Sequence, residues 1–453
     1  MDVIIISAQY VGSISGGGGV HVRELTLELG KLGHTVLVLS MGLGDSPREE
    51  ELLLQDPHNP DPMKREARIE VVRFWTEDSR SISTPFAGTK QEEIDRLVAF
   101  REQVLDYLVD RDGDEVVHIH GHFAVPAMAR ELKQRTRHRI VTSIHTFESI
   151  SERAKGKDGA GQKFIRIMEA MEREAIEHSD CVIVRSEAVR EQIAELFPGA
   201  ADRARIEVIS SGVSSSFIHQ PPLAETELER IRIRYHVSGK LILNVNRIDP
   251  SKGIENLIEA YVRLYQDNRR AHVGGEGLSL VIAGMIEEKN RWYNNRLETM
   301  IMGISDDEIR RSISIHQNIP EQDKLGLFEM ASVFVLSSLL EPFGITVVEA
   351  LAKNVPVVAA AVEGPKDIMD LEQVEPPFAP AAGGVLVHYD DPETRAANLF
   401  EGMRYVLENP EDTEARVGRG RDKTLAQYSW EALVQKKLAI YEQVRQRGPG
   451  ESS

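Results

Sequence analysis

The sequence predicts an α/β protein with two doubly wound domains, each a parallel sheet covered by helices on both faces. Short runs rich in valine and isoleucine alternate with longer segments of helical period along most of the chain. Unbroken apolar runs suit strands buried on both faces, and helical crossovers between them make adjacent strands parallel. The chain also has 453 residues, which is too many for a single hydrophobic core.

The strand-like runs fall into two groups of similar size. They are residues 3–7, 35–39, 116–120, 139–144, 181–185 and 206–209, followed by 241–245, 279–283, 312–316, 333–337, 355–360 and 385–388. Each group is sufficient for one doubly wound domain. We therefore expect one domain over residues 1–220 and another over 238–428, with a last helix at 429–447 that can pack back onto the first domain.

Two segments interrupt this rhythm and are predicted as loops. Residues 41–66 are polar and rich in proline, which favours a mobile excursion without regular structure. Residues 150–162 contain several glycines and lysines and come soon after a predicted strand. Loops at this edge of a parallel sheet are where α/β proteins bind ligands, so the second loop is a candidate for substrate contact.

The composition narrows the classes of partner. The net charge of −18 and the pI near 5.3 disfavour nucleic acid and anionic lipid, because both require concentrated lysine and arginine. Cys181 is the only cysteine, so the sequence offers neither an intrachain disulfide nor a cysteine-based metal site. The chain starts without the features of a signal peptide, and no apolar run reaches the roughly 20 residues that span a bilayer. These features predict a cytoplasmic protein.

Four consecutive glycines lie between the first predicted strand and a predicted helix over residues 20–32. Gly17, Gly18 and Gly19 let the backbone approach a ligand closely, and the start of the helix offers free amide groups to an anion. The alternative is a loose surface turn, but the order of strand, glycines and helix favours a ligand-binding function. The spacing of a dinucleotide-binding fingerprint is absent, so an NAD-dependent oxidoreductase fits poorly.

Two cations occupy the turn after the first strand of the second domain. Arg247 and Lys252 lie between the run 241–245 and a predicted helix over 254–265. At the ligand-binding edge of the sheet, they can neutralise a diphosphate leaving group. Taken alone, the pair is no better explained in this way than as two solvated surface charges.

Glu341 and Glu349 flank a Pro-Phe-Gly turn at which a helix is expected to begin. The amide groups of Gly344, Ile345 and Thr346 would point toward a bound phosphate at the positive end of that helix. The order Thr346-x-x-Glu349 also fits a capping box, in which the glutamate only satisfies the helix terminus. Glu341 has no such structural role.

Histidines gather at the ends of two predicted strands of the first domain. His118, His120 and His122 alternate along one strand and therefore face the same side. They could bind a metal ion, but the strand supplies no carboxylate ligand, so a polar sugar-binding edge without metal is favoured. His145 ends the next strand, where a single histidine is often structural.

Together these residues resemble the retaining glycosyltransferases of family four, whose GT-B fold has two Rossmann-like domains facing each other across a cleft. The resemblance covers most of the chain and is strongest in Glu341-Pro342-Phe343-Gly344, in Glu349-Ala350-Leu351 and in the strand that follows. The glycine turn, the Arg247/Lys252 pair and residues 209–213 match the family in the same order.

The resemblance implies roles for the matching residues. Arg247 and Lys252 would bind the donor diphosphate as it leaves, and Glu349 would hold the ribose. With these two cations, His145 and Glu341 would complete the catalytic set, both at the donor sugar. The other implied donor contacts are Gly17, Gly18, Gly19, Asn318, Phe343, Gly344, Ile345 and Thr346. Family members transfer with retention, without a protein nucleophile, and Mg²⁺ is not essential, so no cofactor beyond the nucleotide sugar is expected.

The acceptor is less well specified. Residues 120–123 and 363–368 look like the sucrose-phosphate synthase type, whereas 17–25 look like bacterial glycogen and maltose-1-phosphate synthases. Sugar-phosphate-using relatives place a lysine or arginine about six residues after the matching histidine, where this chain has Ser151. The candidate acceptor contacts are His120, His122, Arg153, Lys155, Arg173 and Arg185.

The sequence thus predicts a hexosyltransferase that uses UDP-, ADP- or GDP-hexose and a soluble sugar or sugar-phosphate acceptor. The alternative acceptor is a lipid-linked or cell-surface polysaccharide, which would require a basic or apolar patch on the first domain. A non-hydrolysing nucleotide-sugar epimerase fits less well because it lacks the arrangement of Glu341 and Glu349. A non-catalytic sugar-binding protein would predict a broken donor site, whereas the four donor-site residues Arg247, Lys252, Glu341 and Glu349 are present.

Overall fold

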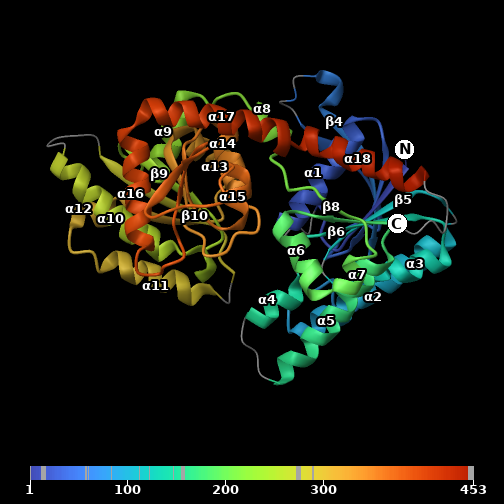
Figure 1. Ribbon diagram of the computed structural model, residues 1–453. Helices are drawn as coiled ribbons and strands as arrows, with labels where there is room; N and C mark the ends of the chain where they lie inside the picture. Colours follow the sequence, from blue (N-terminus) through green and yellow to red (C-terminus); the bar gives the residue numbers. More distant parts are fainter. Residues whose placement is uncertain are drawn as a thin grey trace. The chain divides into compact units, whose positions relative to one another are not determined.

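In the computed structural model, the chain divides into two units (Figure 1). Unit 1 comprises Met1–Ser216 and Trp430–Ser453, and unit 2 comprises Phe217–Ser429. The structure describes residues 2–11, 17–56, 59, 61–82, 84–111, 113–121, 123–145, 147–154, 159–271, 277–287 and 290–446. The chain leaves unit 1 once and returns to it with the last helix.

Within the described residues, unit 1 holds an eight-stranded sheet of order β3-β4-β2-β1-β5-β6-β7-β8. All neighbours pair in parallel except β3 and β4, which are antiparallel. The strands are β1 (Asp2–Ser7), β2 (Thr35–Met41), β3 (Glu49–Gln55), β4 (Glu66–Phe74), β5 (Val116–His120), β6 (Arg139–Ile144), β7 (Cys181–Val184) and β8 (Ile206–Val208).

Helices cover both faces of this sheet. On β1, Val3 and Ile5 pack with α1 and α18, while Ile4 and Ile6 pack with α2, α3 and α5 on the other face. Alternate residues of a strand point to opposite faces, so this unbroken apolar run contributes to two cores. The helices of unit 1 are α1 (Gly17–Lys31), α2 (Lys90–Asp110), α3 (Ala129–Arg135), α4 (Glu148–Ala154), α5 (Gly159–His178), α6 (Glu187–Leu196), α7 (Pro198–Ala201) and α18 (Trp430–Gln446), with 3-10 turns η1 (Pro62–Lys64) and η2 (Pro126–Met128). The short helix α8 (Ser215–His219) begins in unit 1 and ends in unit 2.

The predicted loop at residues 41–66 was wrong for its central part, because residues 49–55 form β3. This strand pairs along its length with β4, which continues the sheet from residue 66 and was not predicted either. In β4, exposed Glu66, Arg68 and Glu70 alternate with buried neighbours, a pattern that a search for unbroken apolar runs overlooks. An edge strand tolerates polar residues on an open side, which explains the acidic start of β3.

The predicted loop at residues 150–162 was also wrong where the structure describes it. Residues up to 154 belong to α4 and those from 159 to α5, while 155–158 lie outside the described residues. Glu172 of α5 anchors α4, because its carboxylate accepts hydrogen bonds from the backbone amide and the hydroxyl of Ser149. The lysine- and glycine-rich composition of this segment therefore predicted a loop where the structure has the end of α4 and the start of α5.

Unit 2 contains a seven-stranded sheet in its described part, of order β11-β10-β9-β12-β13-β15-β14. Only β14, at the edge, is antiparallel, and it was not predicted from the sequence. Each of the predicted runs otherwise overlaps a strand, and the predicted fold class is confirmed. The strands are β9 (Lys240–Val245), β10 (Leu278–Gly284), β11 (Ile313–Gln317), β12 (Ala331–Leu336), β13 (Val357–Ala360), β14 (Phe378–Ala381) and β15 (Gly384–Val387).

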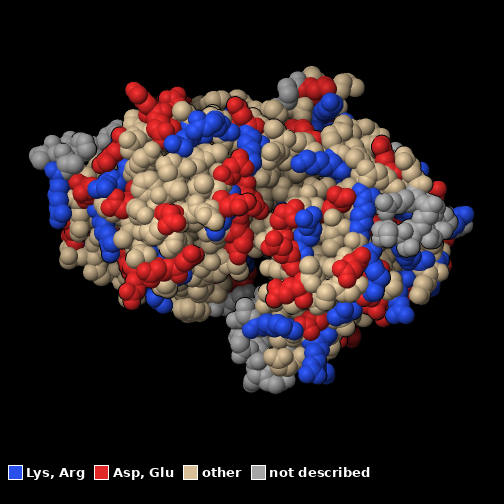
Figure 2. All heavy atoms as spheres, in the orientation of Figure 1, with Lys and Arg blue, Asp and Glu red and all other residues tan. Residues whose placement is uncertain are grey.

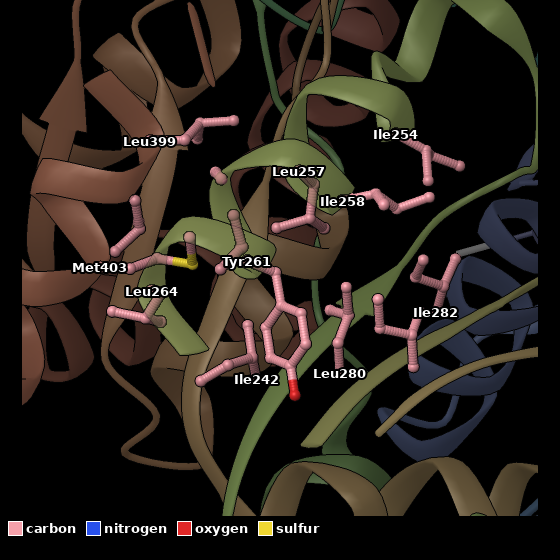
Figure 3. Packing of buried hydrophobic residues seen from close by; sticks show 14 of the residues in the cluster. Ile242, Ile254, Leu257, Ile258, Tyr261, Leu264, Leu280, Ile282, Leu399 and Met403 are labelled. Atoms are coloured by element: carbon pink, nitrogen blue, oxygen red, sulfur yellow. The ribbon is translucent and has the colours of Figure 1, made fainter. Parts of the chain in front are cut away.

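One core of unit 2 lies between the sheet and helices α10 and α16 (Figure 3). Leu257, Tyr261 and Leu264 follow one face of α10 at helical spacing and pack with Ile242 of β9 and Met403 of α16. The helices are α9 (Glu225–Arg234), α10 (Ile254–Ala271), α11 (Arg291–Met302), α12 (Asp307–Arg311), α13 (Glu321–Met330), α14 (Ile345–Ala352), α15 (Glu363–Met369), α16 (Arg395–Glu408) and α17 (Pro410–Tyr428), with the 3-10 turn η3 (Pro250–Lys252).

The molecular surface reflects the acidic composition. Figure 2 shows acidic side chains interspersed with basic ones over the visible face of each unit. The chain has 72 aspartates and glutamates against 54 lysines and arginines, so the field of the whole protein repels polyanions. Among the described helices, none combines the length and apolar character needed to cross a bilayer.

Candidate active site

The strand order of unit 2 identifies where a ligand would bind. From β9 the chain moves outward through β10 and β11, and then returns to place β12 on the other side of β9. Ligands of open α/β sheets bind at the carboxyl ends of strands where the order reverses in this way. Lys252 follows β9 and Glu341 follows β12, so the two residues come from both sides of this switch point.

Lys252 is held by a tight turn after β9. Asp249 caps the 3-10 turn η3 by accepting a hydrogen bond from the amide of Ser251 at 2.9 Å. Gly253 then adopts φ +54, and a Cβ atom there would lie 2.5 Å from the carbonyl oxygen of Ser337. The hydroxyl of Ser337 also donates to the carbonyl of Lys252 at 2.9 Å. The backbone at Lys252 is therefore fixed against the end of β12.

Lys252 and Glu341 form a largely buried ion pair. The Nζ atom lies 2.7 Å from Oε2 of Glu341, and the two side chains are 9% and 14% exposed. Arg247 differs, because its side chain is 54% exposed and lies 3.3 Å from Glu287 and 3.7 Å from Asp249. The sequence predicted both cations at this turn, and the structure shows one fixed in an ion pair and the other largely open to solvent.

The Pro-Phe-Gly turn presents the start of α14 to the same edge. Gly344 has φ +93, a conformation suited to glycine, and immediately precedes the helix. Phe343 is buried against Tyr428, with ring centroids 5.6 Å apart, so its side chain supports the turn. The amide of Gly364 donates to the carbonyl of Glu341 at 2.9 Å, and a Cβ at position 364 would lie 2.1 Å from the carbonyl oxygen of Phe343.

The capping-box interpretation of Glu349 was wrong. The cap position of α14 is Gly344, which has no side chain to accept a hydrogen bond, and Thr346 lies two residues after the cap, inside the helix. Glu349 instead binds Lys324 of α13, with Nζ 2.7 Å from Oε1. Asn318 lies at the end of β11 with φ +51, and its amide donates to the carbonyl of Gly284 at 3.1 Å.

Unit 1 has a corresponding switch point between β1 and β5. His21 of α1, His120 at the end of β5 and His145 just after β6 meet at this edge. The ring centroids of His21 and His145 are 4.7 Å apart, and Nδ1 of His120 lies 3.4 Å from Nε2 of His145. His21 is 6% exposed and also packs against Trp430 of α18. His122 lies outside the described residues.

His118, in contrast, has a structural role. Its Nδ1 lies 2.6 Å from the hydroxyl of Tyr441, and its Nε2 lies 2.8 Å from the hydroxyl of Ser143. Both ring nitrogens are therefore satisfied within the core, and the side chain is fully buried. The ring also lies 4.0 Å from that of His120, centroid to centroid, which supports the orientation of His120.

The histidine cluster of His21, His120 and His145 lies in basic surroundings. Burial and the nearby cations Lys437 and Arg185 lower the pKa of His21 well below its usual value, and burial lowers the pKa of His120 in the same way. The candidate ligand nitrogens of the cluster lie within 4.8 Å of one another, close enough to share a metal ion. The nearby cations disfavour a metal ion and favour an anion or a polar substrate. That the cluster binds no metal remains a prediction.

The other acceptor candidates lie in different surroundings. Arg185 directly follows β7 at the same edge and acts on the charge of His21. Arg153 forms an ion pair with Glu169, and Arg173 lies 5.2 Å above the ring of Phe197. Lys155 lies outside the described residues. Gly17, Gly18 and Gly19 form the first turn of α1, three residues earlier than the predicted start of this helix.

Three residues of interest were missed by the sequence analysis. His21 lies four residues after Gly17, which places it one helical turn into α1, and this spacing was the available signal. Lys324 and Lys437 contact residues far away in the sequence, so no local pattern identifies them. Lys437 is fully buried in α18, and its Nζ has no hydrogen-bond partner among the described residues.

Comparison with protein families identifies both halves of the chain. Residues 227–423 match the family model "Glycosyl transferases group 1", and residues 15–217 match "Glycosyltransferase Family 4". The fold and these two matches define a glycosyltransferase that transfers a sugar from a nucleotide sugar. The chain belongs to glycosyltransferase family 4, the retaining hexosyltransferases with the GT-B fold.

Individual relatives are distant but match over the full length. The α-maltose-1-phosphate synthase of Mycolicibacterium smegmatis is 24% identical and covers 98% of this chain and 100% of its own. The D-inositol 3-phosphate glycosyltransferase of Corynebacterium efficiens is also 24% identical, covering 94% of this chain and 90% of its own. The structure of sucrose-phosphate synthase from Thermosynechococcus elongatus superposes with a TM-score of 0.70 at 20% identity and covers 98% of both chains. At this identity, the structural match establishes the fold.

Proposed function

We propose that the protein transfers a hexose from a nucleotide-diphosphate sugar to a soluble sugar or sugar-phosphate acceptor. Unit 2 binds the donor and unit 1 binds the acceptor. The observation that carries the donor assignment is the Lys252–Glu341 ion pair, which lies at the switch point of unit 2 beside the start of α14. A lysine and helix amides at one sheet edge suit a diphosphate, and a carboxylate beside them suits sugar hydroxyls.

In the proposed reaction, Lys252 and Arg247 bind the diphosphate and neutralise the charge that develops as it leaves. Glu341 and the amides at the start of α14 hold the donor sugar, while His145 contacts it near the reacting carbon. The acceptor hydroxyl attacks C1 from the face on which the diphosphate departs, and its proton passes to a leaving phosphate oxygen. This route retains the anomeric configuration and requires no protein nucleophile.

Two findings support an anionic acceptor. The buried nitrogens of His21 and His120 are accompanied by Arg185, and such neutral imidazoles and guanidinium groups are donors to phosphate and hydroxyl oxygens. The names of three similar proteins also include a phosphorylated compound: maltose 1-phosphate, D-inositol 3-phosphate and sucrose phosphate. We therefore favour a sugar phosphate over a neutral sugar.

The direct test is release of nucleoside diphosphate by the purified protein. UDP-glucose, ADP-glucose and GDP-mannose are each offered with a panel of sugars and sugar phosphates. We expect release that depends on one donor–acceptor pair. Donor binding without turnover on any soluble acceptor would favour the lipid-linked or polysaccharide acceptor. Failure to bind all three donors would contradict the donor assignment.

Glu349→Gln tests the ribose contact. The substitution removes the charge that receives a hydroxyl hydrogen bond, so we expect donor affinity to fall about tenfold with little change in kcat at saturating donor. Donor affinity is measured by calorimetry. Glu321→Gln is the matched control, because Glu321 also lies near Lys324, at 3.4 Å, but its side chain is 70% exposed. Equal donor affinity of Glu349→Gln and the unmodified protein would exclude the ribose contact.

A further inference from the structure

Lys324 is a largely buried cation at the proposed ribose site. It lies in the first turns of α13, and its Nζ is 2.7 Å from Oε1 of Glu349 on α14. The two side chains are only 17% and 13% exposed. Charges placed so far from water attract each other strongly, and removing one of them leaves the other without compensation.

Other contacts fix the position of this lysine. Its Nζ lies 5.3 Å from the ring centre of Phe217, a distance at which a cation is attracted to an aromatic face. Phe217 in turn packs edge-on against Phe328 of α13, with centroids 5.8 Å apart. The lysine therefore has little freedom to move away from Glu349.

The two oxygens of Glu349 are in different environments. Oε1 accepts the hydrogen bond from Lys324, whereas Oε2 is buried and has no hydrogen-bond partner among the described residues. A buried acceptor without a partner costs free energy, which a hydroxyl group of a ligand can recover. Burial raises the pKa of Glu349, and Lys324 opposes this change. Burial lowers the pKa of Lys324, but Glu349 and Glu321 raise it overall.

We propose that Lys324 is a positioning residue for the nucleotide ribose: it holds Glu349 in place and occupies Oε1, so that Oε2 accepts the ribose hydroxyl. This inference rests on the proposed donor site. It goes beyond that site because it assigns discrimination between ribose and deoxyribose to a lysine that touches neither sugar nor phosphate.

The experiment compares ribonucleotides with their 2′,3′-dideoxy counterparts. Calorimetry gives the affinities of UDP, ADP and GDP, and of the three dideoxy nucleotides, for the full chain. In the unmodified protein we expect the preferred ribonucleotide to bind at least about tenfold more tightly than its dideoxy form. In Lys324→Met this ratio should fall to about one, because the ribonucleotide loses affinity and the dideoxy form does not.

The pH dependence gives a second readout. Lys324 is the charge that opposes the effect of burial on Glu349, so without it the pKa of Glu349 rises further. Ribonucleotide affinity should therefore increase with pH more steeply in Lys324→Met than in the unmodified protein. Lys324→Arg retains the charge and should restore part of the ribose preference at pH 7.

Lys353→Met is the matched control. The Nζ of Lys353 lies 5.2 Å from the same Phe217 ring, but its hydrogen bond goes to the carbonyl of Gln220. This variant should keep the full ribose preference. Thermal melting identifies any variant that does not fold. If Lys324→Met does not fold, Lys324→Arg is tested in its place, and its expected result is a reduced ribose preference. An unchanged preference in a folded Lys324 variant overturns the inference and leaves the donor site intact. Absence of nucleotide binding by the unmodified protein overturns both.

Discussion

Lys252→Ala is expected to reduce kcat by about 10²–10³-fold, which is typical for loss of one group that stabilises charge in a transition state. Lys252 is the cation held against the end of β12, and only 7% of the residue is exposed. Its amine is therefore aligned before the diphosphate begins to leave, whereas the largely exposed Arg247 must first be ordered by the ligand. The loss should appear in steady-state release of nucleoside diphosphate, measured with the donor–acceptor pair that the panel of sugars and sugar phosphates identifies.

The control for Lys252→Ala is Lys423→Ala. Lys423 also forms an ion pair in unit 2, with Asp370, but it lies on α17 and not at the proposed donor site. The Lys423→Ala variant should retain full turnover. Because Lys252→Ala removes the partner of a mostly buried Glu341, its folding must be verified by circular dichroism, and Lys252→Met provides a version that keeps the apolar stem. Normal kcat in either folded variant would exclude Lys252 from the leaving-group contact.

Lys437→Met should stabilise the protein. Burial lowers the pKa of Lys437 to about 7, which corresponds to a penalty of about 4 kcal/mol for keeping this cation in the folded state at neutral pH. Methionine fills a similar volume without a charge. We expect the thermal unfolding transition of unit 1 to rise by at least about 5 °C at pH 7, as measured by scanning calorimetry.

The stabilisation should depend on pH in a defined direction. The folded-state pKa of Lys437 lies below its unfolded value, so between them the unfolded chain binds more protons and the unmodified protein gains stability as the pH rises. The difference in unfolding temperature between Lys437→Met and the unmodified protein should therefore become smaller from pH 7 to pH 9. Lys436→Met, the neighbouring exposed position, should behave like the unmodified protein throughout. A constant difference would show that packing, and not charge, is responsible.

The parts of the fold that were predictable are those in which one physical effect dominates. The runs 3–6 and 241–243 are buried on both faces, so uninterrupted hydrophobicity identifies them. β3 begins with three glutamates and lies at an edge, where its pairing with β4 determines its structure and its own residues do not. Tertiary pairing overrides local propensity at such positions, and the antiparallel β14 is a second example.

The candidate site likewise contains residues whose position could be predicted from the sequence and residues for which it could not. Lys252 and Glu341 stand in sequence patterns that include a turn and a helix start, so their place at the sheet edge followed from the order of the elements. The contact made by Glu349 did not follow, because the local order Thr346-x-x-Glu349 fits a cap. The observed helix start at Gly344 excludes the cap, and the observed partner of Glu349 is Lys324 of α13. The partner of a buried charge can lie anywhere in the sequence.

The return of α18 to unit 1 has a consequence for biosynthesis. Trp430 packs on His21 and Tyr441 binds His118, so the face of the sheet that carries Val3 and Ile5 is completed by a helix that follows unit 2 in the sequence. Unit 2 is continuous in sequence and can fold as soon as its own residues have emerged. The order of domain completion is thus the reverse of the order of translation. Nascent unit 1 therefore keeps an uncovered apolar surface until unit 2 and α18 have been synthesised.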